Sequence, residues 1–411
     1  MITLLIVKNN HYFIIPTTLK LLILSFYYEP DLSACSFRST ALVESLSKKL
    51  GKDDCVQVIT MMPNRYKTLR NPALSFEENG NKKIHRIALP KFQVRYFNQA
   101  LTFINYWVGV KRLIKNQKYD LLFVTSGRFF SAFLGATIAN TTKIPFYLDI
   151  RDILSDGVSD VAKSKTVKFF LIPFIKWAEK FSILSATHLN LVSEGFKDSF
   201  SFYEGEITFF TNGIDEKFLE KKYGINQNKF KIITYAGNIG EGQGLEKIIP
   251  EAAKTLKDTF VFNIIGDGRT KCRLIKKLVD LQVDNVNIIN PINRNELTKY
   301  YQESDFLFLH LNDYEAFKKV LPSKIFEYGA TEKPIIAGVD GYARKFMQEH
   351  LKDTLFFEPS NVEEFVEALK NYQPHIISRE DFIVKFNRET IIDKMTDSIL
   401  ALISSKNDKN P

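Results

Sequence analysis

The chain has 411 residues, which is long enough for two domains of ordinary size with a hydrophobic core in each. Hydrophobic residues make up 45% and charged residues 25%, values typical of globular proteins, which argues against wholesale disorder. The net charge of +9 favours an acidic partner, such as a nucleotide or an anionic lipid surface. Nucleic acid is not indicated as the main partner, because the sequence lacks a dense Lys/Arg arm and zinc-ligand spacings.

The first residues are apolar enough to resemble a targeting segment. However, Lys8, His11 and Lys20 interrupt them, so the longest apolar run is well below the ~20 residues of a spanning helix. Tyr27-Tyr28-Glu29-Pro30 is also a poor signal cleavage site. We expect residues 1–19 to be an extension that precedes the fold. The three cysteines are odd in number and far apart, which fits a reducing, cytoplasmic compartment better than a disulfide framework.

Strand-like runs alternate with helical patterns through most of the chain. This alternation predicts an α/β fold with parallel sheets. In the first half, strands are expected at 21–26, 56–60, 121–125, 144–150 and near 186–193. Helices are expected at about 37–50, within 91–118, in a segment that ends at about 139, and within 163–180.

The loop after the first strand is a candidate binding loop, because doubly wound sheets place ligands at the carboxyl ends of their strands. Ser33 and Ser36 could contact a polar acceptor, and Arg38, just inside the following helix, could contact an anion. The alternative is a polar loop with a surface arginine, and the residues alone leave both interpretations open.

A second candidate lies at the end of the strand 144–150, in Asp149-Ile150-Arg151-Asp152. Arg151 could neutralise phosphate charge, and Asp152 could orient a hydroxyl or act as a base. A purely structural Arg/Asp pair is the competing interpretation. His188, in the next strand, is interpreted as a packed histidine rather than a catalytic one.

Two helical regions combine aromatic and basic residues. Residues 91–118 and 163–180 carry more aromatic surface than a single core-facing stripe needs, and lysines flank it. Packing against the first sheet would explain them, and so would contact with an anionic bilayer at the inner face of the plasma membrane. The second region contains the basic residues Lys163, Lys165, Lys168, Lys176 and Lys180, and among them the aromatic residues Phe169, Phe170, Phe174 and Trp177.

The pattern restarts in the second half. Asn212-Gly213 predicts a tight turn, and strands are expected at 232–236, 261–265, 286–289 and 306–309. The loop between the first of these strands and a helix from Leu245 holds four glycines, which would let backbone amides approach a diphosphate. It lacks the G-x-G-x-x-G signature, so it does not indicate NAD. The residues assigned to this site are Gly237, Asn238, Gly240, Gln243 and Gly244, with Gly266 and Asp267 at the end of the next strand.

The stretch from Pro322 to Gly329 is the main candidate for nucleotide binding. Ser323 at a helix start leaves free backbone N–H groups that can hold an anion, and Lys324 adds a positive charge. Glu327, one turn later, could accept hydrogen bonds from a ribose diol. The alternative is a capped surface helix in which Lys324 and Glu327 simply pair. Near the end of the chain, Ile391, Met395, Ile399 and Ile403 mark an amphipathic helix.

Taken together, these motifs resemble the retaining glycosyltransferases of family 4, and among them the WbuB-like branch of O-antigen and capsule sugar transferases. The resemblance implies their GT-B fold, in which two doubly wound, Rossmann-like domains face a cleft. The resemblance covers about residues 20–403. It rests on ordered motifs, each weak alone, at 28–30 with 36–38, 149–152, 212–215, 237–245, 266–268 and 322–328.

The resemblance implies a nucleotide-sugar site in the carboxyl-terminal domain, with Glu327 on the ribose and Lys324 and the glycine loop on the diphosphate. It further implies an amino-terminal domain that binds a lipid-diphosphate-linked saccharide, and a last helix that crosses back onto it. The donor would be a UDP-sugar, with an N-acetylated amino sugar such as UDP-FucNAc as an option. The expected boundaries are residues 1–19 for the extension, 20–210 and 211–385 for the two domains, and 386–411 for the last helix and tail.

The chain departs from the family pattern at three places. Lys319 stands where the first glutamate of the usual Glu-x7-Glu motif is expected, eight residues before Glu327. Gln243 replaces the usual lysine after the glycine loop, and Arg151 and Asp152 stand where a histidine is common.

The function expected from the sequence is retaining sugar transfer, with Lys324, Arg151 and Asp152 as catalytic residues and neither metal nor other cofactor. Two alternatives remain: a nucleotide-sugar 2-epimerase, which would need histidine and carboxylate acid/base pairs, and a non-catalytic polysaccharide-assembly protein, suggested by the incomplete Glu-x7-Glu.

Overall fold

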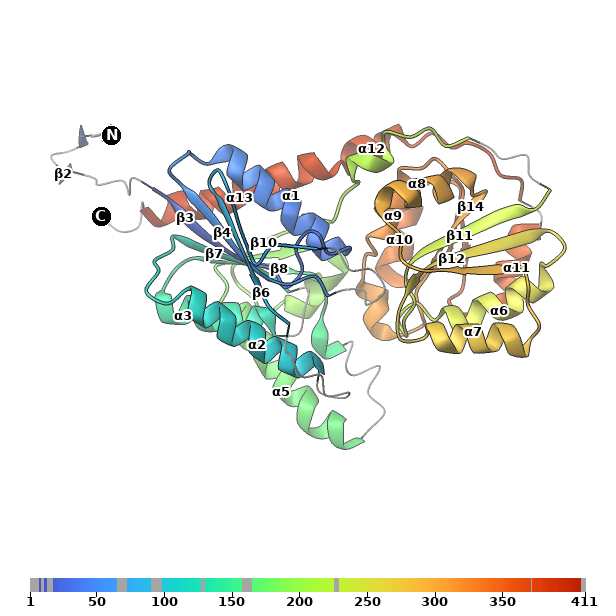
Figure 1. The fold of residues 1–411 in the computed structure, drawn as a ribbon, viewed down its shortest axis with the longest axis horizontal. Coiled ribbons are helices and arrows are strands. Elements are labelled where there is room, and N and C mark those ends of the chain that lie inside the picture. Colours follow the sequence, from blue (N-terminus) through green and yellow to red (C-terminus); the bar gives the residue numbers. More distant parts are fainter. Residues whose placement is uncertain are drawn as a thin grey trace.

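The computed structural model describes residues 7–8, 11–12, 18–64, 72–89, 98–126, 130–156, 165–224, 229–370 and 372–407. Two α/β domains lie side by side, and the last helix runs across both (Figure 1). Ahead of the first domain, β1 (Val7–Lys8) and β2 (His11–Tyr12) pair as a short antiparallel ladder.

The amino-terminal domain is built on an eight-stranded sheet with the order β10-β9-β8-β7-β3-β4-β6-β5. All its pairings are parallel except that of β5 with β6, which forms an antiparallel edge that the parallel pattern did not predict. Helices α1, α2, α3 and α5 cover the two faces of the sheet (Figure 1). The strands are β3 (Lys20–Leu24), β4 (Cys55–Met61), β5 (Phe76–Asn79), β6 (Lys82–Ile87), β7 (Leu121–Thr125), β8 (Phe146–Ile150), β9 (His188–Leu191) and β10 (Glu206–Thr208). The helices are α1 (Ala34–Lys49), α2 (Asn98–Leu113), α3 (Ser131–Thr142), α5 (Lys165–Leu184) and the 3-10 helix η1 (Glu194–Phe200).

The carboxyl-terminal domain has a six-stranded parallel sheet with the order β13-β12-β11-β14-β15-β16. Its strands are β11 (Lys231–Asn238), β12 (Phe260–Asp267), β13 (Val286–Ile289), β14 (Phe306–His310), β15 (Ile335–Gly338) and β16 (Thr354–Phe357). Its helices are η2 (Glu216–Phe218), α6 (Leu245–Thr255), α7 (Lys271–Asp280), α8 (Arg294–Glu303), η3 (Glu315–Lys319), α9 (Lys324–Gly329), α10 (Gly341–His350), α11 (Val362–Lys370) and α12 (Glu380–Lys385).

Both sheets reverse their strand order next to their first strand. In the amino-terminal sheet β3 lies between β4 and β7, and in the carboxyl-terminal sheet β11 lies between β12 and β14. Loops that leave neighbouring strands in opposite directions open a crevice at such a point. The loops after β3 and β11, which the sequence predicted as binding loops, both start at these crevices.

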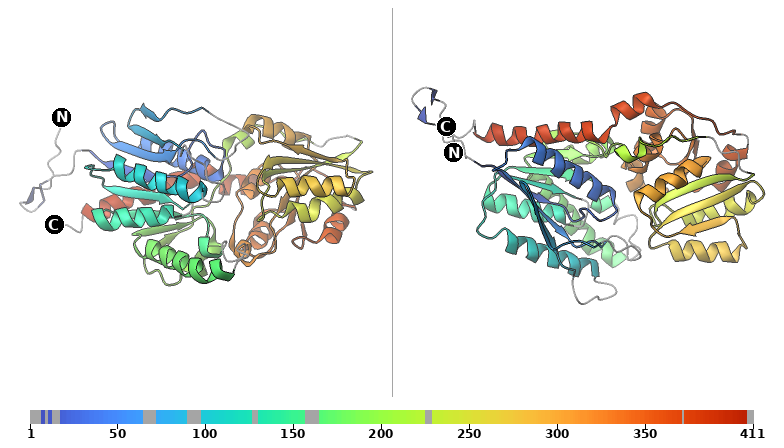
Figure 2. Two further views of the ribbon diagram at one scale, coloured as in Figure 1. Left: turned by 60° about the horizontal axis from the view of Figure 1, so that its bottom comes forward. Right: turned by 45° about the horizontal axis from the view of Figure 1, so that its top comes forward.

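The last helix, α13 (Arg388–Asn407), belongs to the amino-terminal domain by its packing. Of the four predicted positions, Met395, Ile399 and Ile403 join the core cluster formed by β3, β4 and α1, together with Ile392. The first predicted position, Ile391, packs instead in the core of the carboxyl-terminal domain. Figure 2 shows α13 running beside α1. The four-residue spacing that predicted an amphipathic helix therefore marks the face that ties the end of the chain back onto the first domain.

Arg38 is part of this tie and does not reach an acceptor, so its predicted role is wrong. Its side chain is only 2% exposed, and its guanidinium pairs with Asp149 of β8, with Nη2 to Oδ1 at 3.2 Å. It also donates to the carbonyl oxygens of Phe210, at 2.7 Å, and of Thr211, in the interdomain connection. The sulfur of Met395 lies 3.1 Å from Nη2. Arg38 thus joins α1, β8, the interdomain connection and α13. Its buried positive charge is paired with the carboxylate of Asp149.

We predict that Arg38→Ala destabilises the amino-terminal domain by about 3–5 kcal/mol, because it leaves the carboxylate of Asp149 buried without its partner. Urea unfolding, followed by circular dichroism, measures this loss. Adding Asp149→Asn should recover part of the stability, since the amide carries no charge. An Arg38→Ala protein as stable as wild type would contradict the structural role.

Candidate functional site

A cavity of about 460 Å³ lies between the two domains and collects most of the residues expected at the site. Its amino-terminal wall comes from the start of α1 and the segment after β8. Its carboxyl-terminal wall comes from the loops after β11, β12 and β14 and from the start of α9. Of the predicted residues, the lining contains Ser33, Arg151, Asp152, Gly237, Asn238, Gln243, Gly266, Ser323, Lys324 and Glu327.

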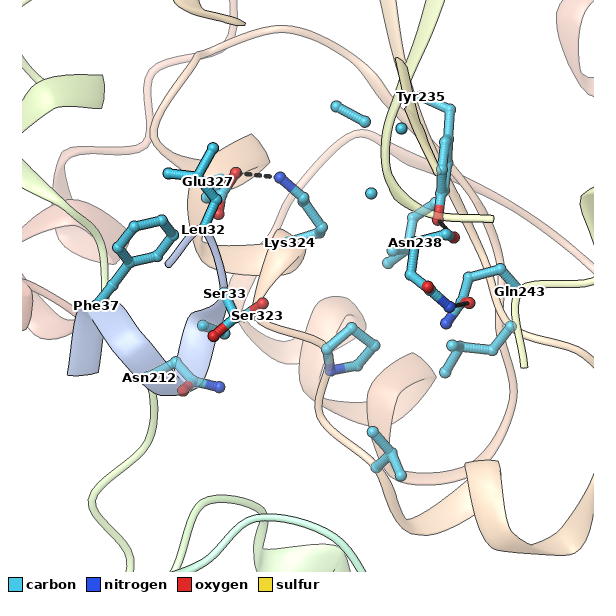
Figure 3. A pocket seen from close by; sticks show the side chains of 18 of the residues that line it. Leu32, Ser33, Phe37, Asn212, Tyr235, Asn238, Gln243, Ser323, Lys324 and Glu327 are labelled. Carbon is cyan, nitrogen blue, oxygen red and sulfur yellow. Dashed lines mark hydrogen bonds and ion pairs between the residues drawn. The ribbon is translucent and has the colours of Figure 1, made fainter. Parts of the chain in front are cut away.

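Lys324 and Glu327 form the charged centre of the carboxyl-terminal wall. Their side chains pair at 2.5 Å (Nζ to Oε2), and Glu327 is only 7% exposed (Figure 3). Tyr301 Oη donates to Glu327 Oε2 at 3.4 Å, and burial raises the pKa of Tyr301 well above its usual value, so it stays a donor. The alternative interpretation expected Lys324 and Glu327 to pair on a surface helix. They do pair, but the helix is not a surface helix, since both residues line the cavity.

Ser323 does not act as the predicted cap. It precedes α9 with helical backbone angles, φ −60° and ψ −23°, and its side chain makes no capping hydrogen bond. A capping serine instead has extended angles and accepts from the amides of the first turn. Its hydroxyl lines the cavity near Lys324.

The glycine loop forms the opposite side of the carboxyl-terminal wall. Asn238 Nδ2 donates to Gln243 Oε1 at 2.7 Å across the loop, and Figure 3 shows Lys324 between this pair and Glu327. Gly244 takes the left-handed conformation, φ +55°, just before α6 begins at the residue predicted. Gly240, Gly244 and Asp267 belong to this region but are not in the cavity lining.

Gly266 allows the two strands β11 and β12 to approach each other at the cavity floor. A Cβ atom at this position would lie 1.9 Å from the carbonyl oxygen of Gly237, and the backbone has φ +150°. Only glycine fits such a contact. The glycine therefore brings the ends of both strands into one wall of the cavity.

His310, at the end of β14, is a buried part of the same wall that the sequence analysis did not assign. Its Nε2 accepts from the amide of Ser360 at 2.9 Å, so its Nδ1 carries the proton and donates to the carbonyl oxygen of Gln243 at 2.5 Å. Burial lowers the pKa of His310 to about 4. The neutral ring thus fastens the glycine loop to β14.

Arg151 and Asp152 line the cavity from the amino-terminal domain. Arg151 Nη2 donates to Asn212 Oδ1 at 2.9 Å, while its buried Nη1 has no hydrogen-bond partner. A buried guanidinium nitrogen without a partner is costly unless a ligand supplies an acceptor. Arg151 is therefore placed to bind an anionic or hydroxyl oxygen in the cavity.

Arg294, at the start of α8, is a lining residue that the sequence analysis missed. Its guanidinium carbon lies 3.4 Å from the ring centroid of Phe37 in the other domain, and its Nη1 pairs with Asp215. Burial would raise the pKa of Asp215, but the guanidinium groups of Arg294 and Arg388 lower it below the usual value. Arg294 follows soon after β13, and that strand also ends at the cavity edge. Its place in the sequence could therefore have marked it as a candidate site residue.

Ser36 was predicted to contact an acceptor, but it lies in the first turn of α1. Its side chain is fully buried and does not line the cavity, and its backbone N–H donates to the side-chain oxygen of Ser33 at 3.1 Å. Ser36 therefore belongs to the capped first turn of α1, because Ser33 is the N-cap of that helix. Of the three predicted acceptor residues, only Ser33 lines the cavity.

A second, smaller cavity of about 50 Å³ adjoins the first in the amino-terminal domain. It lies between α3 and α5, its walls are mainly apolar, and Asp152 lines both cavities. Glu179 of α5 also lines it and accepts from the amides of Leu154 and Ser155 at 2.6 and 3.1 Å. Burial raises the pKa of Glu179, while these hydrogen bonds oppose the rise. The carboxylate thus holds the segment after Asp152 in place.

An exposed aromatic surface lies beside the smaller cavity. On α5, Phe169 is 73% exposed, Trp177 55% and Phe174 47%. Phe174 contacts Phe130 of the cavity wall, with ring centroids 5.7 Å apart. Lys176 and Lys180 are exposed on the same helix. Core packing thus accounts for only part of these aromatics. Lys163 lies outside the described residues.

His188 is packed, as predicted. It is 1% exposed, its ring stacks on Tyr147 with centroids 4.5 Å apart, and burial lowers its pKa. Among the described residues, no helix is both long and apolar enough to cross a bilayer.

Comparison with known proteins places this site in a family. Residues 215–383, which carry the glycine loop and the Lys324–Glu327 pair, match the family model of the glycosyl transferases group 1. The match covers about two fifths of the chain and falls within its carboxyl-terminal half. The match includes most of the sheet and helices that form the carboxyl-terminal wall of the cavity.

One curated relative of the chain is the putative colanic acid biosynthesis glycosyl transferase WcaI of Escherichia coli strain K12. The two are 26% identical over 178 residues, which is 43% of each chain, so the match spans less than half of that relative.

Solved structures share the fold along nearly the whole chain. Sucrose-phosphate synthase of Thermosynechococcus elongatus is 13% identical, with a TM-score of 0.67 over 95% of this chain and 98% of that one. WaaG, a glycosyltransferase involved in lipopolysaccharide biosynthesis, is 13% identical, with a TM-score of 0.61 over 94% of this chain and 98% of that one. Anabaena HepE in complex with UDP-glucose is 12% identical, with a TM-score of 0.58 over 95% of this chain and 98% of that one. These neighbours confirm the GT-B fold predicted from the motifs. The match of residues 215–383 supports the predicted family, while the WbuB-like branch stays a prediction.

We predict that the carboxyl-terminal domain loses stability as the pH falls below the usual histidine pKa of 6.5, because the unfolded chain then binds a proton that the buried His310 does not take up until about pH 4. The free energy of unfolding should fall by about 2 kcal/mol between about pH 7 and about pH 5 from this residue. Urea unfolding at the two pH values measures it.

His310→Gln is the control, because glutamine can donate and accept but does not titrate. It should lose less stability over the same pH interval. Equal losses in the two proteins would show that His310 is not held neutral.

Proposed function

We propose that this protein is a retaining glycosyltransferase that moves a sugar from a UDP-sugar to a hydroxyl of a lipid-linked saccharide in surface-polysaccharide synthesis. The observation that carries the proposal is the Lys324–Glu327 pair in the segment that matches the group 1 family model, facing Arg151 and Asp152 across one cavity. A cation, a carboxylate, and a second basic and acidic pair are the groups that a nucleotide-diphosphate sugar and a hydroxyl acceptor need.

The donor would bind by replacing the Lys324–Glu327 contact. The ribose diol would donate to the carboxylate of Glu327, and the ammonium group of Lys324 would turn toward the diphosphate. The amides of the loop from Gly237 to Gly244 and the hydroxyl of Ser323 would complete the diphosphate site. A UDP-glucose complex of the fold neighbour HepE makes a UDP-linked donor the first candidate.

In the transfer step, the bond between the anomeric carbon and the diphosphate oxygen breaks, and the acceptor oxygen bonds to that carbon on the same face. The acceptor proton would pass to the departing phosphate oxygen. Such a step needs stabilisation of negative charge on the leaving group more than it needs a protein nucleophile. Lys324 would supply it without a metal ion, Arg151 would neutralise further charge, and Asp152 would orient the acceptor hydroxyl.

We predict that Lys324→Ala lowers kcat by about 10²-fold or more, because the leaving diphosphate loses its main cationic partner. Release of UDP in the presence of donor and acceptor measures the rate. Lys299→Ala, which removes an exposed lysine from α8, is the matched control and should keep wild-type turnover. Undiminished turnover in Lys324→Ala would refute the assigned role.

A lipid-linked acceptor is supported by the small apolar cavity behind Asp152 and the aromatic surface beside it. The cavity borders the donor site through Asp152, and its wall residue Phe130 contacts the exposed Phe174. Exposed aromatics beside lysines suit the interface of an anionic bilayer. We therefore propose peripheral contact of α5 with the inner face of the plasma membrane, which would present the acceptor head group next to Asp152.

We predict that the protein floats with liposomes rich in anionic lipid and that Phe174→Ser combined with Trp177→Ser abolishes flotation, because two large apolar anchors are lost. Val279→Ser with Val384→Ser removes two exposed apolar residues from the other domain and should leave flotation intact. Lys176→Ala with Lys180→Ala should weaken it in low salt. Failure of the wild-type protein to bind at any salt concentration would contradict membrane contact.

Two other functions remain candidates. A nucleotide-sugar 2-epimerase would share the architecture, and a non-catalytic assembly protein is suggested by Lys319, which makes the family's glutamate pair incomplete. Incubation with a panel of UDP-sugars separates them. Sugar transfer, or slow donor hydrolysis without acceptor, supports a transferase. Interconversion of the donor indicates an epimerase, and absence of UDP binding indicates an assembly protein.

A further inference from the structure

A charged bridge between the domains lies directly beside the cavity. Lys319 Nζ of η3 contacts Asp156 Oδ2 at 2.8 Å and Ser199 Oγ at 3.0 Å, both in the amino-terminal domain. The backbone takes part as well, since Ser193 Oγ donates to the carbonyl oxygen of Lys319 at 2.6 Å. Side chain and main chain of one residue are therefore both held by the opposite domain.

Close packing accompanies these polar contacts. A Cβ atom built on Gly195 of η1 would lie 2.5 Å from the carbonyl oxygen of Lys319 and 2.8 Å from Cβ of Tyr342. The contact therefore needs glycine at this position, because any side chain would push the two domains apart. Such a fit indicates a defined interface between η1 and η3 rather than a loose approach.

Each end of the bridge leads straight into the candidate site. Lys319 is followed by Val320, Leu321, Pro322, Ser323 and Lys324, all of which line the cavity. Asp156 lies four residues after the cavity residue Asp152. The bridge thus joins the segment that would hold the diphosphate to the segment that would hold the acceptor.

We propose that the Lys319–Asp156 ion pair sets the spacing and register of these two segments, which makes Lys319 a positioning residue for sugar transfer. The inference rests on the proposed function. It also accounts for the departure from the family's Glu-x7-Glu pattern, because a glutamate at 319 would face the carboxylate of Asp156 with like charge. Lys319 itself is not in the cavity lining, so it acts through the residues that follow it.

The experiment is a double-mutant cycle on kcat and KM. We expect Lys319→Ala and Asp156→Asn each to lower kcat by about threefold to tenfold, and the double variant to lose no more than either single one. UDP affinity should fall less than kcat, because the contacts proposed for the ribose and for the glycine loop lie within one domain and do not depend on the bridge. Lys319→Arg and the swap Lys319→Asp with Asp156→Lys should recover most of the rate.

Lys318→Ala is the matched control. This neighbouring lysine pairs with Glu315 at 2.8 Å and Asp340 at 3.6 Å, both in its own domain. Its removal should leave kcat unchanged. Independent, additive losses in the two single variants, or an equal loss in Lys318→Ala, would overturn the proposal. Gly195→Ala should lower kcat more than it lowers UDP affinity, and wild-type kcat in that variant would count against a defined interface.

A readout without activity separates this inference from the proposed function. Hydrogen exchange of residues 320–324 in the UDP-free protein should become faster in Lys319→Ala and Asp156→Asn and stay unchanged in Lys318→Ala. If the wild-type protein transferred no sugar but the exchange changed as stated, the proposed function would fail and the bridge would stand. Unchanged exchange in all variants would refute the bridge.

Discussion

The structure depends on one constraint: two parallel sheets must present their carboxyl edges to the same cavity. Parallel neighbours in a sheet need a crossover connection, usually a helix, so the carboxyl ends of the parallel strands lie at one edge of each sheet. In this chain the loops after β3 and β8 come from one domain and those after β11, β12 and β14 from the other. A ligand of two chemically different halves can then be held with each half on its own domain.

This constraint also explains why the tie between domains is made of buried charge and not only of apolar packing. The connection at 209–214 and the helix α13 both cross from one domain to the other, and Arg38 binds the carbonyl oxygens of the connection while it pairs with Asp149. Apolar contacts would allow α13 to slide along α1. The directional hydrogen bonds of one guanidinium, backed by Asn190 Nδ2 at 2.7 Å from the same carboxylate, fix the position of the connection.

Local pattern was sufficient for much of this account. The parallel strands, the glycine loop, the start of α6 and the Lys324–Glu327 turn follow from short-range spacing, since hydrophobic period and turn chemistry act over a few residues. Arg38 was misassigned because its burial depends on residues more than 170 positions away. The sequence separation is similar for Lys319 and Asp156, at 163 positions. Arg294 was missed because its ring partner Phe37 belongs to the other domain. Pairing between distant segments is set by tertiary packing, and no local pattern reports it.

The central claim is that the Lys324–Glu327 contact is exchanged for a nucleotide diphosphate. A crystal structure of the protein soaked with UDP tests it most directly. The account predicts the pentose hydroxyls on the Glu327 carboxylate, with the ammonium group of Lys324 moved more than hydrogen-bond distance away from it and onto the phosphates. Nucleotide bound at another place, or an intact 2.5 Å contact beneath the bound nucleotide, would contradict it.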